Sequence, residues 1–167
     1  PKRAAGSFLI AGEGDALIIS PDNAARYAPF VQLATDIDTR RLVDLYVRYY
    51  PLFQEAYAEL GYPNAYFNDR LVEVIDHLLA TPDIDGPLRL IRPHVFYEYA
   101  DPELEALSAG QKTLLRMGGA NAARIKAKLR ELRQALTNDS PPLSGSPTDA
   151  GPQVRTVVEF MLTSAIG

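Results

Sequence analysis

Residues 38–61 read DTRRLVDLYVRYYPLFQEAYAELG, the longest amphipathic stretch of the chain. Its apolar side chains recur every three or four residues, which is the period of one face of an α-helix. Asp38 is a favourable N-cap, and Gly61 followed by Pro63 is typical of a helix end. Pro51 predicts a kink, because proline lacks the amide hydrogen and clashes with the preceding turn. The sequence therefore predicts one long core helix between Asp38 and Gly61.

Shorter segments on either side carry their own start and stop signals. Residues 7–19 hold two β-prone runs around a Gly-rich loop and are predicted to form a β-hairpin. Residues 20–22, Ser-Pro-Asp, are typical of a helix start, but Pro29 is expected to divide that helix into one part ending near Tyr27 and a second over 29–35. The same criteria predict helices over 67–80, 102–117 and 120–136. Residues 88–92 and 95–99 are predicted to form two strands or one bent ribbon.

These elements predict a mainly α fold class (α+β), a helical domain with a small antiparallel β element. One arrangement consistent with this class joins the N-terminal strands and the strands of residues 88–99 into one sheet. We expect a single helical domain over residues 1–137. The Pro- and Ser-rich residues 138–153 are predicted to be a flexible linker. Residues 154–167 have helical spacing of apolar side chains and are expected to dock on the domain or on a partner chain.

The composition is that of a globular chain with one core, since 47% of the 167 residues are hydrophobic and 23% are charged. The absence of Cys excludes disulfides, thiolate metal sites and cysteine nucleophiles. The net charge of −4 combines two blocks: residues 13–105 carry 17 acids and 7 bases (−10), and residues 111–137 carry 7 bases and one acid (+6). A dipolar molecule is therefore expected, with its poles solvated, paired with each other, or facing an anionic partner at the basic end.

Five segments of the sequence resemble the bacterial family called domain of unknown function 3014: Ile19–Pro29, Tyr66–Pro82, Tyr97–Pro102, Gly110–Lys112 and Arg116–Gly118. The resemblance spans about residues 6–137 and assigns no activity, cofactor or catalytic residue. It implies a membrane-tethered protein of the cell envelope, on the periplasmic side of the inner membrane. The start at Pro1 fits an anchor or signal segment removed from upstream, and no apolar run of 18 residues occurs in the chain.

The first candidate site is the polar face of the helix predicted over 67–80. Asp69, Glu73 and Asp76 fall within roughly 60° of one another on a helical wheel, with His77 beside them. Three like charges at these spacings repel, so a divalent cation or arginines such as Arg40, Arg41 or Arg48 are expected to neutralise them. The exposed aromatic rings expected nearby, which would extend this candidate ligand face, are Tyr50, Tyr62 and Tyr66.

The second candidate surface is the basic helix predicted over 120–136. Bases flank its narrow apolar stripe on both sides and form a predicted basic contact face: Arg124, Lys126, Lys128, Arg130 and Arg133. An anionic lipid or an acidic protein surface suits such a face near a membrane. Nucleic acid is not expected, because the net charge is negative and no aromatic residue lies between Tyr99 and Phe160.

No catalytic residue, metal or cofactor is predicted. The chain has two histidines and no Gly-x-Ser-x-Gly elbow, and Gln111 separates Gly110 from Lys112 where a phosphate loop needs Gly-Lys. Two hypotheses remain. The first is a non-catalytic envelope module that binds a protein or scaffolds an assembly. The second is a glycan-, small-molecule- or cation-binding enzyme domain centred on Asp69, Glu73, Asp76 and His77.

Overall fold

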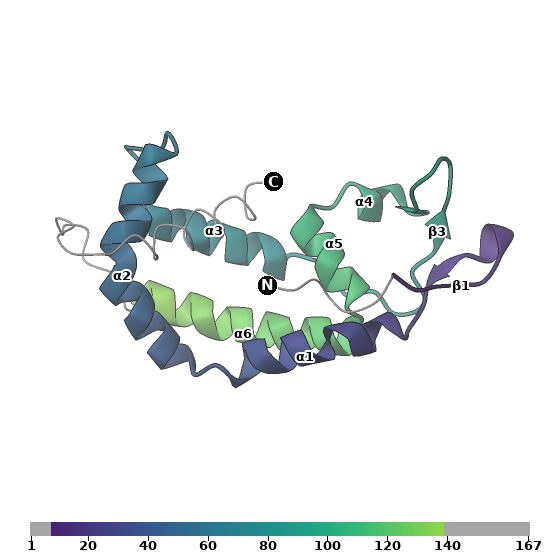
Figure 1. The fold of residues 1–167 in the computed structure, drawn as a ribbon, viewed down its shortest axis with the longest axis horizontal. Helices are drawn as coiled ribbons and strands as arrows, with labels where there is room; N and C mark the ends of the chain where they lie inside the picture. The colour runs from purple at the N-terminus through teal and green to yellow at the C-terminus, as the bar shows by residue number, and fades with distance from the viewer. Residues whose placement is uncertain (1–7, 139–167) are drawn as a thin grey trace. The chain divides into compact units, whose positions relative to one another are not determined.

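A computed structural model describes residues 8–138 of the chain, and this part is mainly helical (Figure 1). Its helices are α1 (Asn23–Asp36), α2 (Thr39–Glu59), α3 (Phe67–Leu79), α4 (Pro102–Glu105), α5 (Ala109–Arg116) and α6 (Gly119–Asn138). Its strands are β1 (Ile10–Ala11), β2 (Ile18–Ile19), β3 (Leu90–Ile91) and β4 (Glu98–Tyr99), with a short 3-10 helix, η1 (Gly14–Ala16), between the first two. The predicted fold class is confirmed. Within residues 8–138 no helix has the length and apolarity needed to cross a membrane.

The described residues form two compact units, each built from two separate stretches of chain. Unit 1 contains residues 8–36 and 78–128, and unit 2 contains residues 37–77 and 129–138. The single domain expected over residues 1–137 stays a prediction. The predicted linker beyond residue 138 and the predicted helix over 154–167 lie outside the described residues.

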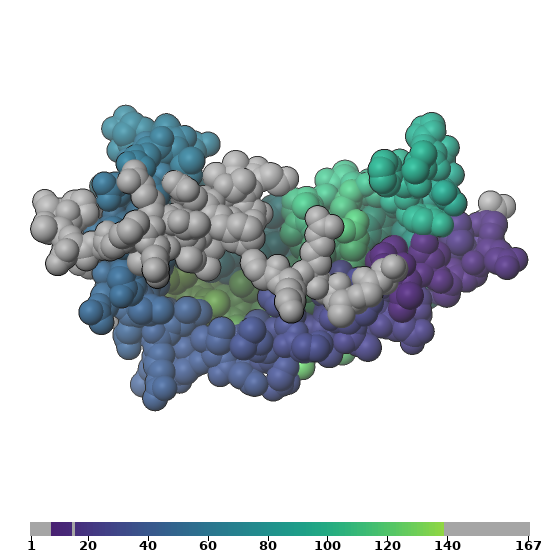
Figure 2. Space-filling model, in the orientation of Figure 1, coloured from purple at the N-terminus to yellow at the C-terminus, as the bar shows by residue number. Residues whose placement is uncertain are grey.

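Unit 1 carries both pairs of strands. Each pair is antiparallel, with Ile10 opposite Ile19 in the first and Leu90 opposite Tyr99 in the second. The predicted N-terminal hairpin is confirmed, and the strands predicted over residues 88–99 pair with each other. The strands are two residues long, shorter than predicted. The two hairpins form separate sheets that lie side by side (Figures 1 and 2), and a single bridge between Ile18 and Arg89 connects them.

Helix α5 connects two clusters of buried apolar side chains in unit 1. The first cluster joins the hairpins to α4 and α5 and consists of Ile19, Leu90, Tyr99, Leu104 and Leu115. The second joins α1, α5 and α6 and consists of Val31, Leu114, Met117 and Ala122. Because Leu114 and Leu115 are adjacent, the short α5 supplies a buried residue to each cluster.

Helix α1 runs without a break through Pro29, so the predicted division of this helix at Pro29 is wrong. A proline inside a helix removes one hydrogen bond and costs about 3 kcal/mol. Val31, two residues further on, is fully buried at 0% exposure, and Tyr27 packs against the same cluster. This packing offsets the lost bond, and the helix continues to Asp36.

The single helix predicted over 102–117 is in fact two helices. Asp101 caps α4 by accepting a hydrogen bond from the amide of Glu103 at 2.8 Å, as its sequence signature indicates. After one turn, Ser108 begins α5 with a capping box: its side chain accepts from the amide of Gln111, and the Gln111 side chain accepts from the amide of Ser108. These two bonds satisfy helix-start amides and allow a new helix to begin at residue 109.

In unit 2, helix α2 begins and ends where the sequence indicates. The Asp38 side chain accepts from the amide of Arg41 at 2.9 Å. Gly61 has a positive φ of 102°, and the amide of Tyr62 donates to the carbonyl of Tyr57, which is the hydrogen-bond pattern of a Schellman end. The helix continues through Pro51. The kink expected there stays a prediction.

The core of unit 2 is mainly aromatic. Phe67 at the start of α3 stacks on Phe53 of α2 with ring centroids 5.5 Å apart, and Tyr46 and Tyr57 pack against the same ring. The Gln54 side chain joins α2 to the turn before α3, since it donates to the carbonyl of Ala65 and accepts from the amide of Phe67. Rings and amide together fix the α2–α3 corner.

Candidate functional site

The predicted acidic residues lie on the exposed side of α3. Asp69, Glu73, Asp76 and His77 are all exposed. Asp76 makes two hydrogen bonds with Arg133 of α6, from Nε to Oδ1 and from Nη2 to Oδ2 at 3.0 Å. This paired geometry stabilises the carboxylate and lowers the pKa of Asp76.

A second arginine lies beside Glu73. Arg70 Nη1 is 3.2 Å from Glu73 Oε2, one helical turn away, and both side chains are well exposed. The arginines that approach these carboxylates are therefore Arg70 and Arg133, rather than the Arg40, Arg41 or Arg48 expected from the sequence. Within residues 8–138, no three His, Asp or Glu side chains are grouped closely enough to hold a metal ion.

The three tyrosines expected beside the acidic face differ in their exposure to solvent. Tyr62 and Tyr66 are each 45% exposed, as predicted. Tyr50 is buried at 5% exposure, so the expectation that it is an exposed ring is wrong. Its hydroxyl donates to Gln54 in the core of unit 2, because the apolar arc of α2 is wide enough to turn this ring inward.

The predicted basic contact face is largely committed to contacts inside the protein. Lys126 is a correction, since it is buried at 3% exposure instead of facing solvent. Its ammonium donates to the Thr81 carbonyl and to Asp83 Oδ1, each at 2.6 Å. A buried lysine persists only when its charge has such partners. It ties the loop after α3 to α6 within unit 1.

The other bases of this predicted face have different surroundings. Arg124 donates to the side chains of Gln32 and Thr35 of α1, each at 2.9 Å. Arg133 pairs with Asp76, as described above. Lys128 is half-buried and Arg130 is exposed. Arg124, Lys126 and Arg133 therefore hold α6 against neighbouring segments of the same unit through hydrogen bonds.

A different surface of unit 1 is exposed and apolar: the tip of the β3–β4 hairpin, defined here as residues 91–97. Phe96 and Val95 are 80% and 73% exposed, the highest values among the large hydrophobic side chains of the described residues. Ile91 and Tyr97 beside them are 45% and 39% exposed. Sequence reasoning assigned these residues to strands. Sequence reasoning missed their exposure because the run Val95–Tyr97 has the composition of a strand, whereas the pairing of β3 with β4 stops at Ile91 and Glu98.

The base of the tip is held in a defined shape. The guanidinium of Arg92 lies over the ring of Tyr97, 5.3 Å from its centroid. Residues 93–96 connect these two side chains and start with Pro93, whose fixed φ restricts the turn. The tip therefore presents two adjacent apolar side chains on a short, convex loop.

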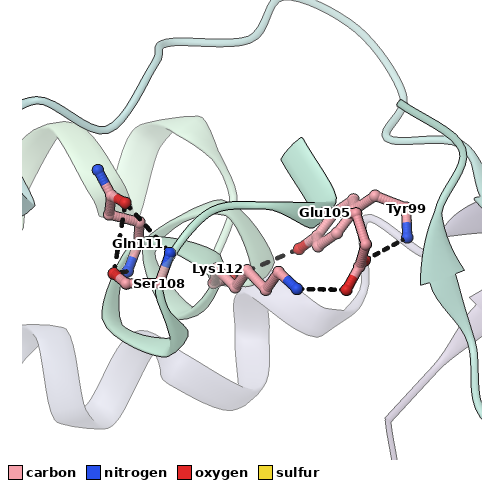
Figure 3. Close-up of polar contacts among 5 residues, drawn as sticks. All are labelled: Tyr99, Glu105, Ser108, Gln111 and Lys112. Atoms are coloured by element: carbon pink, nitrogen blue, oxygen red, sulfur yellow. Dashed lines mark hydrogen bonds and ion pairs between the residues drawn. The ribbon is translucent and has the colours of Figure 1, made fainter. Parts of the chain in front are cut away.

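The hairpin is anchored on its other side by Glu105 of α4 (Figure 3). Glu105 Oε2 accepts from the amide of Tyr99 at 2.8 Å, and Oε1 accepts from the ammonium of Lys112. The Glu105 carboxylate thereby accepts the hydrogen bond of the Tyr99 amide, which is then not free to pair with another strand. The hydrogen bond from Lys112, together with that from Tyr99, lowers the pKa of Glu105.

This lowered pKa predicts how stability depends on pH. A carboxyl group whose pKa is lower in the folded chain stabilises it fully above its unfolded pKa, about 4.3, and this contribution is lost as the pH falls through the folded pKa. We expect Glu105→Gln to be less stable than the wild type at pH 7, with the difference shrinking below about pH 4.5. Urea unfolding at a series of pH values measures this, and a difference that stays constant down to about pH 3 would exclude the assigned role.

Residues 2–133 match the family described as "Protein of unknown function (DUF3014)", and the chain belongs to this family. No curated protein and no solved structure matches the chain. The segments Tyr97–Pro102, Gly110–Lys112 and Arg116–Gly118, on which the resemblance in part rests, lie in unit 1. They supply Tyr99 and Lys112 of the Glu105 network, next to the hairpin tip.

Proposed function

We propose that this protein is a non-catalytic binding or scaffolding module of the cell envelope, and that it attaches to its target through the β3–β4 tip. The observation that carries this proposal is the exposure of Val95 and Phe96. Each such side chain is worth about 1.5–3 kcal/mol when it is removed from water. Adjacent exposed apolar side chains of this kind mark interaction sites on many folded proteins.

The contacts of the predicted acidic face favour binding over catalysis. Arg133 and Arg70 approach Asp76 and Glu73, so the charges of these carboxylates have partners within unit 2. An ion pair on an exposed helix face is ordinary surface chemistry. No observation singles out the enzyme alternative, whereas the exposure of the hairpin tip is what a binding surface requires.

The envelope location rests on the family resemblance alone. Membrane tethering and the periplasmic side of the inner membrane belong to the same proposal. The protein partner expected from the sequence also stays a prediction, and the Glu105 side chain on the amide of Tyr99 argues against strand addition at that point of β4.

Photo-crosslinking tests the attachment surface. A benzophenone amino acid placed at position 96 of the full chain, expressed in the native bacterium, is expected to give covalent adducts on irradiation. The matched control is position 33, because Leu33 of α1 is also well exposed, at 65%. Adducts at 96 without comparable adducts at 33 are expected. Equal yields at both positions, or none at 96, would contradict the proposal.

A further inference from the structure

We propose that the target of the β3–β4 tip is an anionic phospholipid surface, into which Val95 and Phe96 insert. This inference rests on the proposed function, since it names what the same tip binds. Three features of the tip carry it: its shape, its charge and its aromatic composition.

The shape favours a bilayer over a protein surface. Stable protein interfaces bury about 800 Å² on each partner and are broad. The tip offers two adjacent side chains on a loop of residues 93–96, which is too narrow to cover such an area. A small convex apolar wedge suits the headgroup region of a membrane, where lipids adapt to its outline.

The charge favours an anionic surface. Residues 88–97 contain two arginines and one histidine and no Asp or Glu, in a chain with 21 acids and a net charge of −4. The exposed Arg92 and His94 lie on either side of Pro93 at the base of the wedge. A basic side chain near a membrane surface strengthens binding to anionic lipids over a range of about one Debye length. The nearest acid, Glu98, is half-buried in β4 opposite Ile91, whereas Arg92 and His94 are exposed.

The aromatic composition matches a membrane interface. Tyr97 is 39% exposed and stacks under the Arg92 guanidinium. Tyrosine and arginine both have an apolar body and a polar end, which is the chemistry of the water–lipid boundary. Phe96 lies one residue further out and is 80% exposed, so the apolar ring precedes the amphipathic pair into the lipid.

Vesicle co-sedimentation of the full chain tests the inference. We expect binding to vesicles of phosphatidylcholine mixed with phosphatidylglycerol, and much weaker binding to phosphatidylcholine alone. The double variant Val95→Ser, Phe96→Ser should bind at least about tenfold more weakly. Arg92→Gln should lower affinity about threefold to fivefold, and added salt should weaken wild-type binding.

Two matched variants serve as controls. The pair Phe30→Ser, Leu33→Ser removes exposed apolar side chains from α1, and Arg130→Gln removes an exposed arginine from α6. Both should bind vesicles like the wild type. The tip variants should keep the wild-type melting temperature, because the side chains they replace are exposed.

Several results would contradict the proposed binding of lipid by the tip. No binding to anionic vesicles, or an equal loss in the α1 pair and the tip pair, would overturn the lipid assignment. If vesicles fail but the adducts at position 96 prove to be protein, the lipid assignment falls and the proposed attachment surface stands. Absence of adducts at position 96 would remove both.

Discussion

Lys126→Ala is expected to lower the free energy of unfolding by about 3 kcal/mol. The substitution removes a buried aliphatic stem and an ammonium that donates at 2.6 Å to both the Thr81 carbonyl and Asp83. The Thr81 residue is itself buried at 4% exposure, so its carbonyl loses a charged donor in a place that water reaches poorly.

Urea unfolding of the purified chain measures this effect. Arg130→Ala is the matched control, because it removes an exposed base from the same helix and should change stability by less than about 0.5 kcal/mol. Lys126→Met, which keeps most of the stem, should fall between the two. If Lys126→Ala were as mild as Arg130→Ala, the buried position of Lys126 would be refuted.

Asn23→Ala is expected to cost about 3 kcal/mol, because this side chain makes four hydrogen bonds. Asn23 is 1% exposed. Its amide nitrogen donates to the carbonyls of Leu9 and Ser20, at 2.6 and 2.9 Å. Its amide oxygen accepts from the Leu9 amide at 3.0 Å and from Arg26 at 2.9 Å. One side chain thus ties the segment before β1 to the first turn of α1.

Asn121→Ala provides a graded comparison. The Asn121 side chain donates to the carbonyls of Ala24 and Met117 and is only half-buried, so we expect a loss of less than about 1 kcal/mol. Thermal unfolding of the three proteins should rank them wild type, Asn121→Ala, Asn23→Ala. A variant at position 23 that is as stable as the one at 121 would show that the four bonds do not act together.

The helix ends of this fold could be predicted well because they depend on local chemistry. Asp38 and Gly61 act within one turn of their own positions, and a sequence shows such neighbours directly. The break between α4 and α5 was missed although its signal is equally local, since Ser108 and Gln111 have the spacing of a capping box.

Other features of the structure depend on residues that are distant in the chain, so the local sequence could not predict them. The continuity of α1 through Pro29 depends on the burial of Val31 against α5 and α6, which are far away in the chain. The pairing of Asp76 with Arg133 spans 57 residues. For the same reason Lys126 looked like a surface base, since only the fold places Thr81 and Asp83 around it.

The two candidate sites also differ in how far the sequence could predict them. Charge and helical period brought Asp69, Glu73 and Asp76 to one exposed face of α3, as expected, but could not show which arginines approach them. The hairpin tip was hidden because Val95 and Phe96 have the composition of a buried strand. Exposure depends on where pairing stops, and pairing stops at Ile91 and Glu98.

The most direct test of the tip as the attachment surface is the fluorescence of a tryptophan at position 96. The chain has no Trp, so Phe96→Trp creates a sole reporter at the tip, and Leu33→Trp provides the same reporter on α1. On addition of membranes isolated from the organism that encodes the chain, the emission of the Phe96→Trp variant should move to shorter wavelength and become shielded from a soluble quencher, while that of the Leu33→Trp variant stays unchanged. Emission from the position-96 reporter that neither shifts nor becomes shielded would contradict attachment through the β3–β4 tip.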